Sequence, residues 1–119
     1  MDGITAYQDN AISIQSKGRL IVILYDSAIK FMNMAIMEME KKNYEAKGRY
    51  INKASAIINE LNLALDMIEG GEIASNLRKR YIFMNNRLSQ ANVKCDPQMV
   101  RDVIKLTEEL KKIWKTISF

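Results

Sequence analysis

The chain has 119 residues, a length typical of one domain that can bury a core without disulfides or metals. It contains one cysteine and no histidine, so an intramolecular disulfide is excluded and the commonest general base and metal ligand is missing. The net charge of +4 at pH 7 is mild and gives little support to a nucleic-acid-binding function. Composition therefore favours a protein that is not an enzyme and that has no catalytic, cofactor or metal site.

The first segment, residues 1–16, is weakly patterned and is predicted to form a flexible N-terminal arm or a short helix. Its apolar side chains, Ile4 and Tyr7 among them, are candidate anchors. The segment has no basic region followed by an apolar run, so a secretory signal is not expected. The absence of a disulfide also suits a reducing, cytoplasmic location.

The most apolar stretch of the chain, Leu20–Met39, is predicted to lie in a helix over about residues 17–41. One apolar stripe follows the helical spacing, as in an ordinary amphipathic helix. Further apolar side chains fall outside this stripe: Leu20, Ile23, Ile29, Met34, Ile36 and Met37. A helix that is apolar almost all round is central in a bundle, inserted in a membrane or shared with a partner.

Polar residues near the middle of this stretch argue against a membrane span. Asp26, Lys30 and Asn33 lie there, and one centred charge costs about 2.5–3.5 kcal/mol on insertion scales. The sequence therefore predicts no membrane insertion, and the excess apolar surface is assigned to the bundle or to a partner.

Three more helices follow, and local signals mark their ends. Asn43 is a candidate N-cap, the Gly70-Gly71 pair interrupts the helical pattern, and Asp96-Pro97 is typical of a helix start. The predicted ranges are about 44–69, 72–92 and 97–116. No segment alternates with a period of two, so the prediction is all-α: a single domain, residues 1–119, folded as an antiparallel up-down four-helix bundle.

An ordered set of motifs resembles the FliS family of flagellar export chaperones. Leu20 to Ile29 reads Leu-x-x-x-Leu-Tyr-Asp-Ser-Ala-Ile, and Ala56 to Asp66 reads Ala-Ile-Ile-x-Glu-Leu-x-x-x-Leu-Asp. The set is completed by Ala6-Tyr7-Gln8, Gly71-Glu72-Ile73-Ala74, Asn76-Leu77, Tyr81 and Trp114. The chain has Ser27 where family members often have glycine, and Ser16-Lys17-Gly18 where they often have Ser or Thr followed by Pro.

The resemblance implies a cytoplasmic chaperone that binds the disordered C-terminal segment of flagellin through apolar grooves. Binding would prevent premature polymerisation and keep flagellin ready for type III secretion by the flagellar export apparatus. The bound protein is expected to be a monomer, and the free protein at most a weak homo-oligomer. Two alternatives stay open: a self-associating helical bundle, and a basic bundle that binds nucleic acid.

The resemblance and the apolar pattern together nominate a set of flagellin-binding residues. Tyr7 and Tyr25 are preferred for recognition, because a phenol suits a partly solvent-exposed surface. The N-terminal arm with Tyr7 is expected either to cover part of the client groove in the free protein or to contribute contacts to the client. The aliphatic candidates are divided between the core and the groove in a way that the sequence leaves open. The full set is Ile4, Tyr7, Leu20, Leu24, Tyr25, Asp26, Ile29, Ile57, Leu61, Leu65, Ile73, Leu77 and Tyr81.

Overall fold

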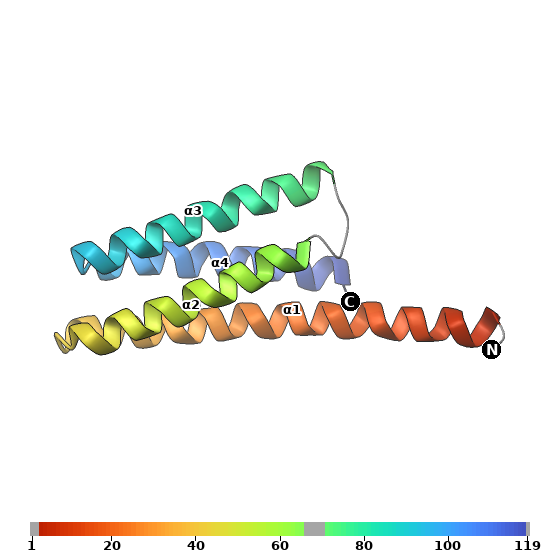
Figure 1. Ribbon diagram of the computed structural model, residues 1–119, viewed down its shortest axis with the longest axis horizontal. Helices are drawn as coiled ribbons and strands as arrows, with labels where there is room; N and C mark the ends of the chain where they lie inside the picture. The colour runs from red at the N-terminus through yellow and green to blue at the C-terminus, as the bar shows by residue number, and fades with distance from the viewer. Residues whose placement is uncertain (1–2, 66–70, 119) are drawn as a thin grey trace.

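The computed structural model describes residues 3–65 and 71–118, with side chains for residues 18–65 and 71–116. These residues form four helices and no strand (Figure 1). The helices are α1 (Gly3–Glu40), α2 (Tyr44–Ala64), α3 (Glu72–Lys94) and α4 (Pro97–Ser118). The all-α prediction is confirmed.

The helices run up and down in an antiparallel bundle. In the described part of the chain, α1 packs against α2 and α4, and α3 packs against the same two helices. The helices α1 and α3 therefore face each other across the diagonal. The short loop after α1 and the turn after α3 lie at the same end of the bundle (Figure 1).

Two of the predicted helix starts have the expected capping geometry. The Asn43 side-chain oxygen accepts a hydrogen bond from the Ala46 amide at 3.2 Å. The Asp96 carboxylate accepts one from the Gln98 amide at 3.0 Å, and α4 begins at Pro97. Gly71 has a positive φ of 94° directly before α3, a conformation that glycine adopts without strain. The structure does not describe residues 66–70. Gly70, the other half of the predicted glycine pair, and the predicted end of the second helix at residue 69 fall in this range.

The first helix is longer than the sequence predicted. It begins at Gly3 instead of about residue 17, so the predicted arm is a helical continuation of α1. No proline interrupts this part of the chain, and an internal glycine such as Gly18 costs only about 1 kcal/mol relative to alanine. The continuation extends beyond the ends of the other three helices (Figure 1).

The core is built from one buried stripe on each helix. On α1 the buried positions Tyr25, Ala28, Met32 and Ala35 follow each other at steps of three and four residues. The segment Gly18–Glu40 is long and apolar enough, by length and composition, to cross a membrane. In the bundle this stripe packs against the other helices, so α1 serves as a core helix.

The seam between α2 and α3 is polar. The Ser55 hydroxyl donates to the Asn85 side-chain oxygen at 2.9 Å, and the Asn85 amide donates to the Asn59 side-chain oxygen at 2.8 Å. The Lys47 ammonium donates to the Asn92 carbonyl at 2.9 Å, close to the end of α3 where a positive charge is favoured. These bonds fix the register of α3 against α2.

Candidate binding surfaces

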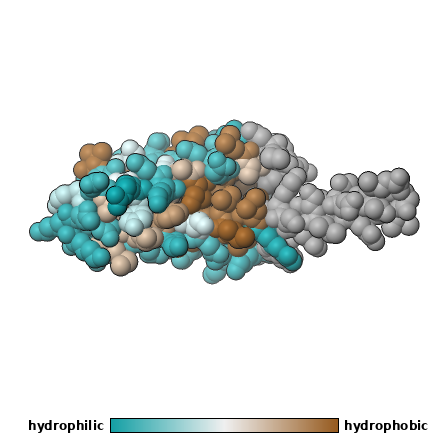
Figure 2. Space-filling model, turned by 60° about the horizontal axis from the view of Figure 1, so that its bottom comes forward, coloured by the Kyte–Doolittle hydropathy of each residue, from teal (hydrophilic) through white to brown (hydrophobic). Residues whose placement is uncertain are grey.

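A strip of apolar side chains runs from the outer surface of α1 to its border with α2. Leu20 is 55% exposed and Ile23 is 57% exposed, although both are large aliphatic residues. Leu24 and Ile57 are half-buried against the core. We call Leu20, Ile23, Leu24 and Ile57 the apolar strip. Figure 2 shows hydrophobic side chains gathered near the point where the described side chains of α1 begin.

The register of α1 against α2 brings the members of the apolar strip together. The Phe31 and Tyr50 rings stack with their centroids 6.3 Å apart. In a pair of antiparallel helices that keeps this register, Leu24, seven residues before Phe31, is expected beside Ile57, seven residues after Tyr50. Leu20 is one turn further along α1. The strip therefore has members on both helices.

Other exposed apolar side chains are spread over all four helices. They are Met37, Tyr44, Leu63, Ile73, Ile82, Phe83, Val93 and Ile113. Single exposed apolar residues are normal on soluble proteins, whereas clusters indicate binding sites. Leu20 and Ile23 stand out because they lie next to half-buried apolar neighbours on the same face.

A charged pocket lies on the other side of α1, at its border with α4. Its volume is about 330 Å³, and its lining residues are Asp26, Ile29, Glu108, Lys111, Lys112 and Lys115. The Lys111 ammonium and the Asp26 carboxylate form an ion pair across it at 2.5 Å. Asp26 is thus held by α4, and three lysines surround a half-buried isoleucine.

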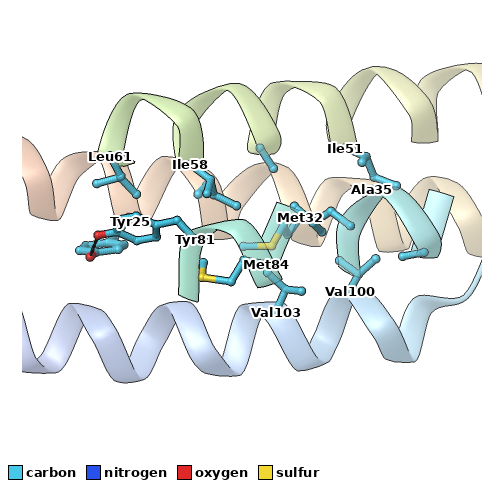
Figure 3. Packing of buried hydrophobic residues seen from close by; sticks show 14 of the residues in the cluster. Tyr25, Met32, Ala35, Ile51, Ile58, Leu61, Tyr81, Met84, Val100 and Val103 are labelled. Carbon is cyan, nitrogen blue, oxygen red and sulfur yellow. Dashed lines mark hydrogen bonds between the residues drawn. The ribbon is translucent and has the colours of Figure 1, made fainter. Parts of the chain in front are cut away.

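Two tyrosines join the diagonal helices inside the core. Tyr25 of α1 is 0% exposed and Tyr81 of α3 is 1% exposed, and their hydroxyl oxygens are 2.5 Å apart. Figure 3 shows the two side chains meeting inside the buried cluster. The Trp114 side chain of α4 packs against the same buried cluster. The expectation that Tyr25 lies at a partly solvent-exposed surface is wrong, because the side chain is buried and its hydroxyl hydrogen-bonds to Tyr81 within the bundle.

Burial raises the pKa of both phenols above the usual value. For Tyr25 burial is the largest cause, and the neighbouring Tyr81 adds to it. For Tyr81 burial is again the largest cause, and hydrogen bonds from Tyr25 and Trp114 oppose it. Both hydroxyls are therefore neutral in the folded protein.

These raised pKa values predict a loss of stability in alkali. The stabilisation is complete below the unfolded-state pKa of tyrosine, about 10, and is lost as the pH rises above that value. Urea unfolding at pH 8 and pH 11 measures the loss. A variant carrying Tyr25→Phe and Tyr81→Phe is expected to lose less stability between the two pH values, and an equal loss would contradict the prediction.

The structure divides the predicted site residues into four groups. Buried in the core are Tyr25, Leu61, Leu65 and Tyr81. Half-buried against the core are Leu24, Ile29, Ile57 and Leu77. Exposed are Leu20, Asp26 and Ile73. The side chains of Ile4 and Tyr7 lie outside the described residues, and only their backbone is seen, within α1.

Sequence reasoning missed several members of the two surfaces. Ile23 was recognised as apolar outside the main stripe, yet it was not among the candidate residues. No sequence pattern marked the lysines of the pocket, because only the packing of α4 against α1 brings them close to Asp26. These lysines are Lys111, Lys112 and Lys115.

A family profile described as "Flagellar protein FliS" matches residues 1–118. The chain is similar to the Flagellar secretion chaperone FliS of Vibrio cholerae, with 38% identity over 109 residues that cover 92% of this chain and 80% of the relative. It is also similar to the protein of the same name from Salmonella typhimurium, with 38% identity over 121 residues that cover 98% of this chain and 90% of the relative. A third relative with this name, from Bacillus subtilis, has 33% identity over 111 residues that cover 93% of this chain and 82% of the relative. The chain belongs to the FliS family of flagellar secretion chaperones.

Proposed function

We propose that this protein is a cytoplasmic chaperone that holds the disordered C-terminal segment of flagellin. Holding that segment prevents premature polymerisation and keeps flagellin competent for type III secretion by the flagellar export apparatus. The observation that carries the proposal is the apolar strip, which stays open to solvent although the bundle already has a complete core. Family membership supports the same function.

The energetics of coupled folding agree with a strip rather than a single pocket. A disordered segment that folds on binding gives up about 2–5 kcal/mol or more of the gross interaction energy in becoming ordered. Fully burying one aliphatic side chain returns about 1.5–3 kcal/mol. Several contacts are therefore needed, and Leu20 and Ile23 supply two of them.

The client segment is proposed to form helices on the apolar strip. An amphipathic helix laid in a shallow groove uses apolar anchors at steps of three and four residues. Leu20, Ile23 and Leu24 present apolar side chains at the same steps on α1. Because the apolar residues of the client helix and of α1 have the same spacing, their side chains can interdigitate along the border of α1 with α2.

The N-terminal part of α1 is proposed to add contacts to the client. Its backbone continues the helix past the rest of the bundle instead of folding back over Leu20. Ile4 and Tyr7 are therefore assigned to client binding, and not to covering the apolar strip in the free protein.

Sedimentation tests the proposal against the self-associating alternative. The free protein is expected to sediment as a monomer and to form a one-to-one complex with purified flagellin. A stable dimer that forms no complex with flagellin would contradict the proposal and favour self-association. Salt-sensitive retention of DNA or RNA, with no flagellin complex, would favour the nucleic-acid binder.

A further inference from the structure

The pocket between α1 and α4 has a chemistry different from that of the apolar strip. Three ammonium groups and two carboxylates line it around the half-buried Ile29. Lys111 is engaged by Asp26. Lys112 and Lys115 are exposed, and neither forms an ion pair within the part of the chain that the structure describes. The pocket therefore offers two unpaired positive charges beside an apolar surface.

These features fit an acidic side chain of a peptide. A carboxylate can accept hydrogen bonds from the lysine ammonium groups, while the methylene groups of the same residue lie on Ile29. A dense polyanion fits less well, because Asp26 and Glu108 would repel closely spaced phosphates. The lining residues thus favour a protein segment with an isolated Asp or Glu over nucleic acid or an anionic lipid surface.

The pocket also lies within reach of the apolar strip. Asp26 follows Ile23 by three residues on α1, which is less than one helical turn and about 4.5 Å along the axis. Ile23 is on the outer surface of α1, between the α2 border and the α4 border. One bound segment can therefore contact the strip with its apolar side chains and the pocket with a neighbouring acidic one.

We propose that the α1–α4 pocket binds an Asp or Glu side chain of the flagellin segment whose apolar residues occupy the apolar strip. This inference rests on the proposed function, since it assigns a second contact to the same client. The strip supplies most of the affinity, and the pocket fixes the position of the segment along α1, because charged contacts confer register and specificity more than affinity.

Charge reversal with a matched control tests the pocket. The variant Lys112→Glu with Lys115→Glu is compared with Lys79→Glu with Arg80→Glu, which makes the same change in net charge at exposed sites on α3. The probe is a peptide of the flagellin C-terminus, titrated at two salt concentrations. The pocket variant is expected to bind the peptide about tenfold more weakly, a loss of about 1.4 kcal/mol in binding free energy, and with a smaller salt dependence. The α3 variant is expected to bind the peptide within about twofold of the wild-type affinity.

The possible outcomes separate the two proposals. If the wild-type protein does not bind the peptide, the proposed function itself fails. If wild type and both variants bind alike, with the same salt dependence, only the pocket assignment is overturned. Carbodiimide coupling, which joins a carboxylate to an amine in contact with it, is expected to link Lys112 or Lys115 to an Asp or Glu of the peptide. A coupled complex without such a link would also overturn the pocket assignment. The assignment would fail as well if the pocket variant lost binding to duplex DNA or anionic vesicles while its affinity for the peptide stayed unchanged.

Discussion

Replacing both Leu20 and Ile23 with glutamate is expected to weaken binding of the flagellin C-terminal segment by about 100-fold. If the client binds as proposed, each substitution removes an apolar contact and places a charge against apolar surface of the client, and the combined loss is about 3 kcal/mol. Both side chains are more than half exposed, so folding stability is expected to change by less than about 0.5 kcal/mol per site. Titration calorimetry gives the affinity and urea unfolding gives the stability.

The control for this double substitution is Val93→Glu. Val93 is 85% exposed near the end of α3, so it is also apolar and open to solvent. Its substitution is expected to leave client affinity within about twofold of wild type, because single exposed apolar residues carry little binding energy. Equal losses in the Val93 variant and the Leu20 and Ile23 variant would show that the apolar strip has no special role.

Replacing Tyr25 with alanine is expected to destabilise the fold by about 3–5 kcal/mol, the range for large aromatic residues in a core. Two effects combine, since the substitution leaves a cavity in the core and removes the partner of the Tyr81 hydroxyl. This loss is a large share of the about 5–15 kcal/mol that stabilises a typical domain. Urea unfolding followed by circular dichroism measures it.

A double-mutant cycle isolates the hydrogen bond from the cavity. Tyr25→Phe and Tyr81→Phe each keep the ring and remove one hydroxyl, which leaves the other phenol without its hydroxyl partner. Each single variant is expected to lose about 1–3 kcal/mol for its unsatisfied partner. The double variant has no orphaned hydroxyl, so its loss is expected to be smaller than the sum by at least about 0.5 kcal/mol. Strictly additive losses would show that the two hydroxyls do not interact.

Local signals in the sequence were enough to predict most helix ends. Asn43 and the Asp96-Pro97 pair cap their helices through contacts within a few residues, so neighbouring residues alone determine them. The start of α1 was misplaced because residues 1–16 are weakly patterned and gave no local signal for a helix. In the structure the helix begins at Gly3.

The division of α1 between core and surface could not be predicted from its own sequence. Tyr25 and Ile23 are two residues apart, and both were compatible with either face of a helix that is apolar almost all round. Packing decides between them: the Tyr25 hydroxyl is matched by Tyr81 across the bundle, while the Ile23 side chain is 57% exposed. The chemistry of the pocket needs the same long-range information, since its lysines are more than eighty residues from Asp26 along the chain.

The two surfaces of α1 give the helix two separate tasks. Its buried stripe holds the bundle together through contacts that no client can reach, Tyr25 and Met32 among them. Its outer surface, with Leu20 and Ile23, is free for a partner. Because different side chains serve stability and binding, substitutions on α1 are expected to affect one property without the other, and the variants above are chosen to show this separation.

The most direct test of chaperone function is a circular-dichroism titration with a flagellin C-terminal peptide. The peptide should have about 40 residues, enough for two or more helices of average length. If the protein folds a disordered client on its apolar strip, the helical signal of the mixture exceeds the sum of the two separate signals and saturates at one peptide per protein. A mixture whose spectrum equals that sum at every ratio would contradict client folding on this bundle.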